Sequence, residues 1–190
     1  MRLFAGVELP PEIRAGCATA AAAIASRLEE AGVRTRIRWT PERNLHVTLW
    51  FFGHVDEPGQ ARIAAAMSAP WLTPAFPAAI GGAGAFPPSG PPRILWLGLQ
   101  QGGDAFAALY RELAPRVGPL GFPAERRAYH PHITIGRVKE TTRDSARIRA
   151  TLPGIAPPAQ TFEVRSITLF HSQLSSRGSA YEPLLRVPLT

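Results

Sequence analysis

The chain has 190 residues, of which 45% are hydrophobic and 18% charged, so it is neither disordered nor fibrous and is too short for two independent large domains. The most membrane-like stretch, residues 18–26, is alanine-rich and too short to cross a bilayer. The first nine residues lack the long apolar segment of a secretory signal, and the single cysteine, Cys17, allows no internal disulfide. We therefore expect a cytoplasmic protein without a membrane segment.

The net charge is +7, from 21 basic and 14 acidic residues. Such a balance favours an anionic partner. All basic residues but Lys139 are arginine, which suits bidentate phosphate contacts but also follows from a G+C-rich genome. The charge therefore supports an anionic substrate without identifying it.

In the N-terminal half, apolar alternation predicts strands at residues 2–9, 34–39 and 45–52. Pro10-Pro11 opens a predicted helix that runs to about Glu30. A shorter, alanine-rich helix is predicted over residues 58–68. The long helix carries an apolar stripe of Ile13, Cys17, Ala20, Ile24 and Leu28.

The region of residues 70–92 is rich in proline and glycine and has the composition of an interdomain linker. Its apolar content favours strands and loops instead. The remaining predicted elements, in chain order, are strands at 75–86 and 93–99, a helix at 104–117, a strand at 130–138, a helix at 142–151, a proline-rich loop at 153–158, and strands at 162–170 and 181–188.

Strands and helices do not alternate strictly, which predicts an α+β fold. The sequence also repeats itself, because His46-Val47-Thr48-Leu49 and His132-Ile133-Thr134-Ile135 follow one pattern about half a chain apart. We expect residues 1–190 to form a single bilobed domain with a pseudo-twofold axis. In it, two antiparallel sheets face a central cleft and the helices lie outside.

Residues two apart on a strand project to the same face. His46 therefore lies beside Thr48, and His132 beside Thr134, with the aliphatic residues turned to the core. If the two lobes pack as a symmetric pair, two imidazoles and two hydroxyls face one cleft. One copy of the pattern would be weak support for catalysis, but two matched copies are hard to obtain by chance.

Two histidines suit phosphodiester cleavage, because an imidazole near neutral pH is able to accept a proton in one form and donate it in the other. The threonine hydroxyls are suited to stabilise the phosphate oxygens. We expect no metal and no cofactor, since both motifs lack nearby carboxylates and Glu42, the nearest, precedes its strand.

These residues resemble the two-histidine phosphoesterase superfamily, and within it the RNA 2′,3′-cyclic phosphodiesterases, also called the 2′-5′ RNA ligase family. The resemblance covers nearly the whole chain. It rests on RLFAGVELP (2–10), WTPERNLHVTL (39–49) with the following Phe52-Gly53, YHPHITIGR (129–137), ITLF (167–170) and GSAYEPL (178–184).

The resemblance implies metal-independent hydrolysis of terminal ribose 2′,3′-cyclic phosphate to a 2′-phosphate, with tRNA halves as possible substrates and 2′-5′ ligation as the reverse chemistry. It also suggests His132 as the base and His46 as the acid, although pseudo-symmetry leaves the opposite assignment open. The expected partners are RNA ends; no obligate protein partner is needed, and we expect a monomer.

Two further residues are substrate-binding candidates. The position of Arg137 is commonly arginine in the family. Strict alternation puts this side chain on the face opposite to His132, unless a bulge at Gly136 returns it to the same face. Trp50 shares the face of His46 by alternation and is suited to stack on a nucleobase. His130 shares a face with His132, which raises a rival metal-site reading, but no third ligand is evident.

Two other functions compete with this one. A non-catalytic module that binds RNA ends would not need two matched histidines. A two-histidine phosphodiesterase acting on a small cyclic nucleotide or oligoadenylate is compatible with both motifs, because they recognise a phosphate and not its attachments.

Overall fold

The computed structural model describes residues 1–139, 143–154, 161–175 and 178–190 and confirms the α+β class. No helix in this described part is long and apolar enough to cross a membrane. The helices are α1 (Pro11–Glu30), α2 (Glu57–Ser68), α3 (Gly103–Val117) and α4 (Ser145–Thr151). The strands are β1 (Arg2–Glu8), β2 (Ile37–Trp39), β3 (His46–His54), β4 (Phe76–Phe86), β5 (Ile94–Gln101), β6 (Ile133–Val138), β7 (Thr161–Val164), β8 (Ser166–Ser175) and β9 (Gly178–Pro188).

The two expected antiparallel sheets are present as two halves of one curled sheet, with the order β7-β4-β5-β6-β3-β1-β8-β9 and β2 beside β6. One half holds β3, β1, β8 and β9, and the other holds β6, β5, β4 and β7. The pair Val47↔Ile133 is the register contact that joins β3 to β6. The two His–x–Thr strands are therefore neighbours at the centre of the sheet.

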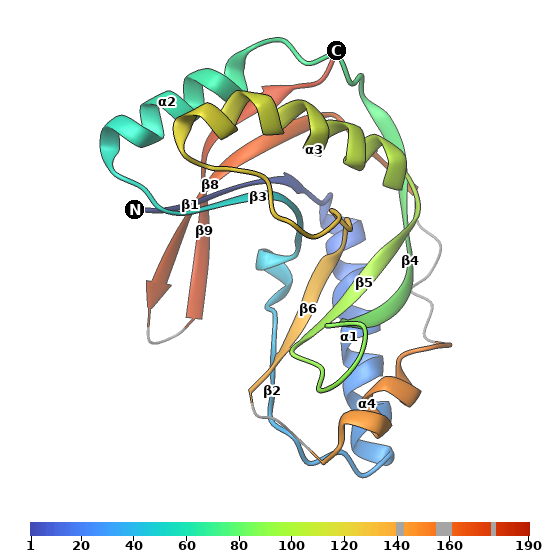
Figure 1. The fold of residues 1–190 in the computed structure, drawn as a ribbon. Coiled ribbons are helices and arrows are strands. Elements are labelled where there is room, and N and C mark those ends of the chain that lie inside the picture. Colours follow the sequence, from blue (N-terminus) through green and yellow to red (C-terminus); the bar gives the residue numbers. More distant parts are fainter. Residues whose placement is uncertain (140–142, 155–160, 176–177) are drawn as a thin grey trace.

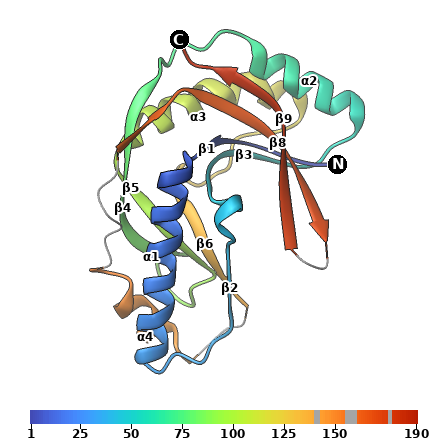
Figure 2. The ribbon, with the colours of Figure 1, turned by 180° about the vertical axis from the view of Figure 1, so that it is seen from behind.

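The halves exchange their helices. Helix α1 follows β1 but packs on β6 and α4, whereas α3 follows β5 but packs on β3 and α2. Figure 1 shows α2 and α3 over one half, and Figure 2, which is the view from behind, shows α1 and α4 over the other. Each half is thus covered by chain that begins in the other, which binds the halves together.

The predicted strand at 162–170 is in fact two strands. Strand β7 pairs with β4 in one half, and β8 pairs with β1 in the other. The break falls at Arg165, where the chain passes between the halves, so one continuous strand is not possible. The first predicted residue of the helix at 142–151 and most of the proline-rich loop at 153–158 lie outside the described residues.

The long helices form where their apolar stripes meet the sheet. Helix α1 starts at Pro11 as predicted, and its stripe is buried, including Ile13, Cys17 and Ile24. Helix α3 buries Phe106, Leu109, Leu113 and Val117 completely, at the i, i+3, i+7 and i+11 spacing of one helix face.

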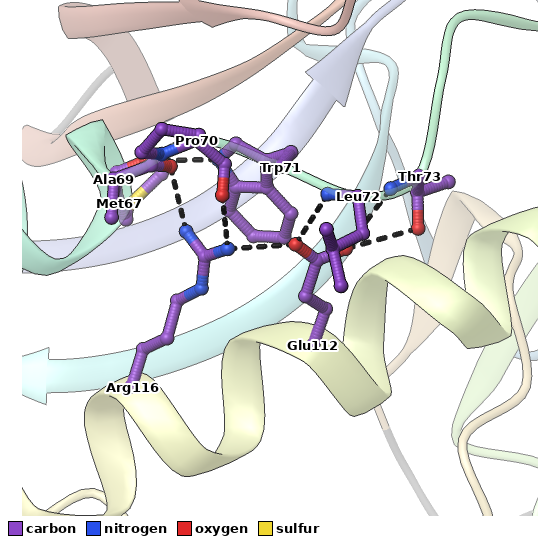
Figure 3. A network of polar contacts seen from close by, with 8 residues as sticks. All are labelled: Met67, Ala69, Pro70, Trp71, Leu72, Thr73, Glu112 and Arg116. Atoms are coloured by element: carbon purple, nitrogen blue, oxygen red, sulfur yellow. Dashed lines mark hydrogen bonds and ion pairs between the residues drawn. The ribbon is translucent and has the colours of Figure 1, made fainter.

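The segment between α2 and β4 is held against α3 by a polar network (Figure 3). The Glu112 carboxylate accepts hydrogen bonds from the Leu72 N–H (2.7 Å) and from the Thr73 N–H and hydroxyl. Arg116 pairs with Glu112 (2.7 Å), donates to the carbonyls of Ala69 and Pro70, and lies 4.2 Å over the Trp71 ring. This network directs the chain from one half of the sheet to the other.

Candidate active site

The register at the centre of the sheet brings the two motifs together. Because Val47 lies opposite Ile133 in an antiparallel pair, His46 lies beside Thr134 and Thr48 beside His132. All four side chains project to the same face, opposite to the buried Val47 and Ile133. The two imidazoles lie on a diagonal of this rectangle, for which the usual separation is about 7–8 Å.

Each imidazole is oriented by the same backbone contact. Nδ1 of His46 lies 2.7 Å from the carbonyl oxygen of Asn44, and Nδ1 of His132 lies 2.7 Å from the carbonyl oxygen of His130. A carbonyl only accepts hydrogen bonds, so Nδ1 carries the proton in both rings. Nε2 is then free to accept a proton, or to donate one when the ring is charged.

The His46 ring lies in an aromatic enclosure. Its centroid is 4.7 Å from that of Phe4 and 5.2 Å from that of Tyr181, and its Nε2 is 3.0 Å from the Thr48 hydroxyl. The Asn44 amide donates to the carbonyl of Ser179 (2.6 Å), which anchors the Asn44 backbone to β9. The enclosure fixes the ring plane of His46.

The His132 ring has a matching but more open surrounding. Its centroid lies 5.0 Å from that of Phe86 and 6.5 Å from that of Trp96. The loop before β6 is tied to β3, because the Tyr129 hydroxyl donates to the carbonyl of Thr48 (2.9 Å). This bond links the loop that carries the His130 carbonyl to the strand of the first motif.

Both histidines are easier to deprotonate than a free imidazole. Burial is the main cause that lowers the pKa of His46 to about 4, and the charges of His132 and Arg137 lower it further. Burial also lowers the pKa of His132, with contributions from His130 and Arg137. The positive charge of Arg137 thus lowers the pKa of both imidazoles, and Arg137 lines the same hollow as His46.

A bulge brings Arg137 to the face of the motif. On β5, Leu95 and Trp96 are consecutive, but their partners on β6 are Gly136 and Thr134, so Ile135 is an extra residue. The irregularity lies one residue before the predicted bulge at Gly136. Arg137 is consequently exposed and lines a hollow together with His46 and Thr134.

Strand β3 has the same bulge at the same place. Ala5 and Gly6 pair with Trp50 and Thr48, so Leu49 is the extra residue. Simple alternation therefore fails for Trp50, which does not share the face of His46. Trp50 nevertheless lines a hollow with Thr48 and His132, so its contact with substrate stays a prediction. Trp50 is 5% exposed and its ring stacks on Tyr110 at 4.7 Å, while Phe51, 48% exposed, takes the place that Arg137 has in β6.

Two hollows open on this face. A polar hollow of about 240 Å³ is lined by His46, Thr48, Thr134 and Arg137, together with Arg2, Phe4, Thr40, Asn44, Phe51, Ser172, Ser179 and Tyr181. An apolar hollow of about 280 Å³ is lined by Thr48 and His132, together with Leu49, Trp50, Phe86, Ile94, Tyr110, Glu125, Arg127, Ala128, Tyr129 and His130. Thr48 borders both hollows, while His46 lines the polar one and His132 lines the apolar one.

The site thus contains the four predicted motif residues and Arg137, with Trp50 in the lining of the apolar hollow, and it adds residues that the sequence did not reveal. Asn44 and His130 contribute through their carbonyl oxygens, which leave no sequence signal because every residue has one. Phe4 and Phe86 come from other strands and are placed only by pairing across the sheet. Within the described residues, no three His, Cys, Asp or Glu side chains lie close enough together to hold a metal ion.

The site consists of two His–x–Thr strands that pair at Val47↔Ile133 on a curled α+β sheet, the arrangement expected of a two-histidine phosphoesterase. The chain matches the model of the 2′-5′ RNA ligase superfamily over residues 20–175. It is 30% identical to an RNA 2′,3′-cyclic phosphodiesterase of Archaeoglobus fulgidus over 97% of this chain and 98% of that protein. It is 29% identical to the Escherichia coli protein of the same name, covering all of this chain and 97% of that one.

The solved structures agree with the sequence matches. The crystal structure of E. coli LigT bound to 3′-AMP has a TM-score of 0.74 and 26% identity, covering 100% of this chain and 98% of that one. The protein TT0787 of Thermus thermophilus has a TM-score of 0.75 and 27% identity with the same coverage. The chain therefore belongs to the 2′-5′ RNA ligase superfamily.

Proposed function

We propose that this protein is an RNA 2′,3′-cyclic phosphodiesterase that hydrolyses a terminal cyclic phosphate by acid–base catalysis with His46 and His132. The observation that carries the proposal is the register Val47↔Ile133, which sets the two imidazoles diagonally on one face with a threonine beside each. The relatives named RNA 2′,3′-cyclic phosphodiesterase support the substrate class.

In the proposed reaction, neutral His132 takes a proton from water at Nε2 as the water oxygen attacks phosphorus. The bond from phosphorus to the ribose 3′-oxygen breaks, and protonated His46 donates its Nε2 proton to that oxygen. The product is a ribose 2′-phosphate, and each imidazole ends in the state in which the other began. The hydroxyls of Thr48 and Thr134 and the charge of Arg137 stabilise the phosphate oxygens during attack.

Fixed tautomers support this proposal. Since Nδ1 of each ring is bound to a carbonyl, the proton moves through Nε2 alone, and no ring rotation is needed between acid and base forms.

The paired geometry requires both halves of the sheet, so we infer that residues 1–190 act as one bilobed unit and need no protein partner. A monomer, action on tRNA halves, and reverse 2′-5′ ligation belong to the proposal. So does a cytoplasmic location, which the single, buried Cys17 favours.

The substrate and the product form the first test. Purified protein is expected to convert cytidine 2′,3′-cyclic phosphate to cytidine 2′-phosphate in the presence of EDTA, and phosphorus NMR identifies the product. A 3′-phosphate product would reverse the sugar orientation in the site. Loss of activity in EDTA, restored by a divalent metal, would overturn the mechanism.

The roles of the two histidines need a second test. A cyclic substrate with sulfur in place of the 3′-oxygen has a leaving group that needs little help from an acid. His46→Ala is expected to recover most of its lost activity on this substrate, and His132→Ala to recover none. The opposite result would exchange the assignments of acid and base.

A further inference from the structure

A strip of basic side chains leads away from the proposed active site along β2 and β6. Arg38 pairs directly with Arg137, and the Lys139 N–H donates to the carbonyl of Arg36 (3.0 Å), so the register continues by two residues. Alternation puts these four residues on one face and the partly buried Ile37 and Val138 on the other. We call Arg36, Arg38, Arg137 and Lys139 the basic strip.

The basic strip has an unfavourable arrangement of charge. Like charges directly opposite on neighbouring strands are destabilising. Among the described residues, no carboxylate forms an ion pair with any of the four side chains, and all four are exposed. An anionic ligand would relieve this repulsion, whereas nothing in the described part of the fold does so.

The strip continues directly from the proposed active site. Arg38, Arg137 and Lys139 line a hollow of about 240 Å³ that shares Thr40, Asn44, Arg137, Ser179 and Tyr181 with the polar hollow. Arg137 thus borders both spaces. Lys139 directly follows the last residue of β6 and lies two residues beyond Arg137, a step of about 6.6–6.8 Å in extended chain.

We infer that the basic strip binds the phosphodiester next to the terminal cyclic phosphate, so that an oligonucleotide end is a better substrate than a free cyclic nucleotide. A chain that ends in a 2′,3′-cyclic phosphate has its other phosphates only on the 5′ side. The two-residue step from Arg137 to Lys139 is comparable with the spacing of successive phosphates along a single strand. With Arg137 at the cyclic phosphate, Arg38 and Lys139 hold the next one; this inference rests on the proposed function.

The test compares kcat/KM for cytidine 2′,3′-cyclic phosphate with that for the dinucleotide CpC ending in the same cyclic phosphate. The protein is expected to prefer the dinucleotide by roughly tenfold, the effect of about one charge-assisted contact. A dinucleotide with an uncharged methylphosphonate linkage keeps the second nucleoside and is expected to lose the preference. This arm separates phosphate recognition from base stacking.

The variants assign the effect to the strip. The double variant Arg38→Gln/Lys139→Gln is expected to bring the dinucleotide-to-mononucleotide ratio close to one, and Lys139→Arg to keep it. Arg62→Gln, which removes an exposed charge from α2, serves as the control and should leave the ratio unchanged.

Three outcomes would overturn the inference. They are equal kcat/KM values for the two natural substrates, a preference that survives in the double variant, and a preference that survives the methylphosphonate linkage. Each leaves hydrolysis of the mononucleotide intact and so spares the proposed function. Failure to hydrolyse either natural substrate would overturn the proposed function, and this inference with it.

Discussion

At the scale of single residues, the two histidines are equivalent in how they are held and unequal in how they are surrounded. Both bind a carbonyl oxygen two residues earlier through Nδ1 at 2.7 Å. His46 is enclosed by Phe4, Phe170 and Tyr181, and His132 opens toward the loop that carries His130. Burial of His46 lowers its pKa to about 4, so the protonated His46 that the proposed acid role requires is populated mainly at low pH.

Removing either imidazole should remove the proton transfer that we propose for it. We expect His46→Ala and His132→Ala each to lower kcat by about 10²–10⁴-fold on the linear dinucleotide CpC that ends in a 2′,3′-cyclic phosphate. Thr48→Ala and Thr134→Ala should each cost at most about 2.7–4 kcal/mol, the scale of one oxyanion donor. The double histidine variant should be little worse than either single one, because the two groups act as a unit.

These rates are measured by steady-state kinetics, with circular dichroism to establish that each variant is folded. Arg62→Gln again controls for an unrelated change of charge. A folded His46→Ala or His132→Ala protein with near-normal kcat would contradict the catalytic assignment.

The pH dependence follows from the lowered pKa values. One imidazole must be protonated and the other neutral, so kcat/KM describes a bell between two apparent pKa values of the free protein. Burial lowers the pKa of His46 to about 4 and also lowers that of His132, so the optimum should lie below pH 6.5. The cyclic phosphate keeps its single charge throughout this range.

A substitution at Arg137 tests the direction in which its charge shifts the pKa values of the two histidines. Its positive charge lowers the pKa of both imidazoles, so Arg137→Gln should raise both and move the kcat/KM optimum to higher pH. The rate at the optimum should also fall, because a cation beside the phosphate is lost. An optimum that stays in place or moves to lower pH would show that Arg137 is remote from the histidines.

At the scale of elements, two equivalent bulges shape the site. Strands β3 and β6 each gain one extra residue directly after the threonine of the motif, Leu49 in one and Ile135 in the other. In both strands the extra residue and its successor are buried, and the residue after them is exposed. Phe51 and Arg137 therefore occupy equivalent positions, one offering an aromatic face and the other a charge.

The Glu112 network gives a prediction about the stability of an element. Glu112→Ala removes the acceptor for two backbone N–H groups and the partner of Arg116, so the free energy of unfolding should fall by about 1–3 kcal/mol. Urea denaturation measures the change. Arg111→Ala, one residue earlier and exposed, is the control and should stay within about 0.5 kcal/mol. Equal effects of the two changes would mean that the network contributes no stability.

At the scale of the whole molecule, the exchanged helices and strands make the two halves interdependent. Helix α1 covers β6 and α3 covers β3, and β2, which precedes β3 in the chain, pairs with β6 in the other half. Neither half retains a complete core without chain from the other. The proposed active site lies where the two halves meet, at the pair Val47↔Ile133.

Cooperative unfolding is the expected consequence. Tryptophan fluorescence and far-ultraviolet circular dichroism should give one coincident urea transition, as for a two-state protein. Leu113→Ala in α3 and Ile148→Ala in α4, both at fully buried positions in different halves, should each lower the whole transition by about 2–5 kcal/mol. Two separate transitions, or a variant that shifts only one probe, would show that the halves unfold independently.

The sequence by itself determined the local elements and the catalytic candidates. The start of α1 at Pro11, its buried stripe and the strong strands around both motifs follow from local patterns of apolar residues, proline and glycine. The two His–x–Thr motifs are also local, because the two-residue period of a strand alone puts each imidazole beside its hydroxyl.

Only the tertiary structure decided how these pieces combine. Strict alternation predicts the wrong face for Trp50, because a bulge depends on the neighbouring strand and not on the strand that contains it. The split at Arg165 has the same origin, since β7 and β8 pair with strands in different halves. The carbonyls of Asn44 and His130, and the facing charges of Arg38 and Arg137, depend on strand register, which fixes contacts between residues that are distant in the sequence.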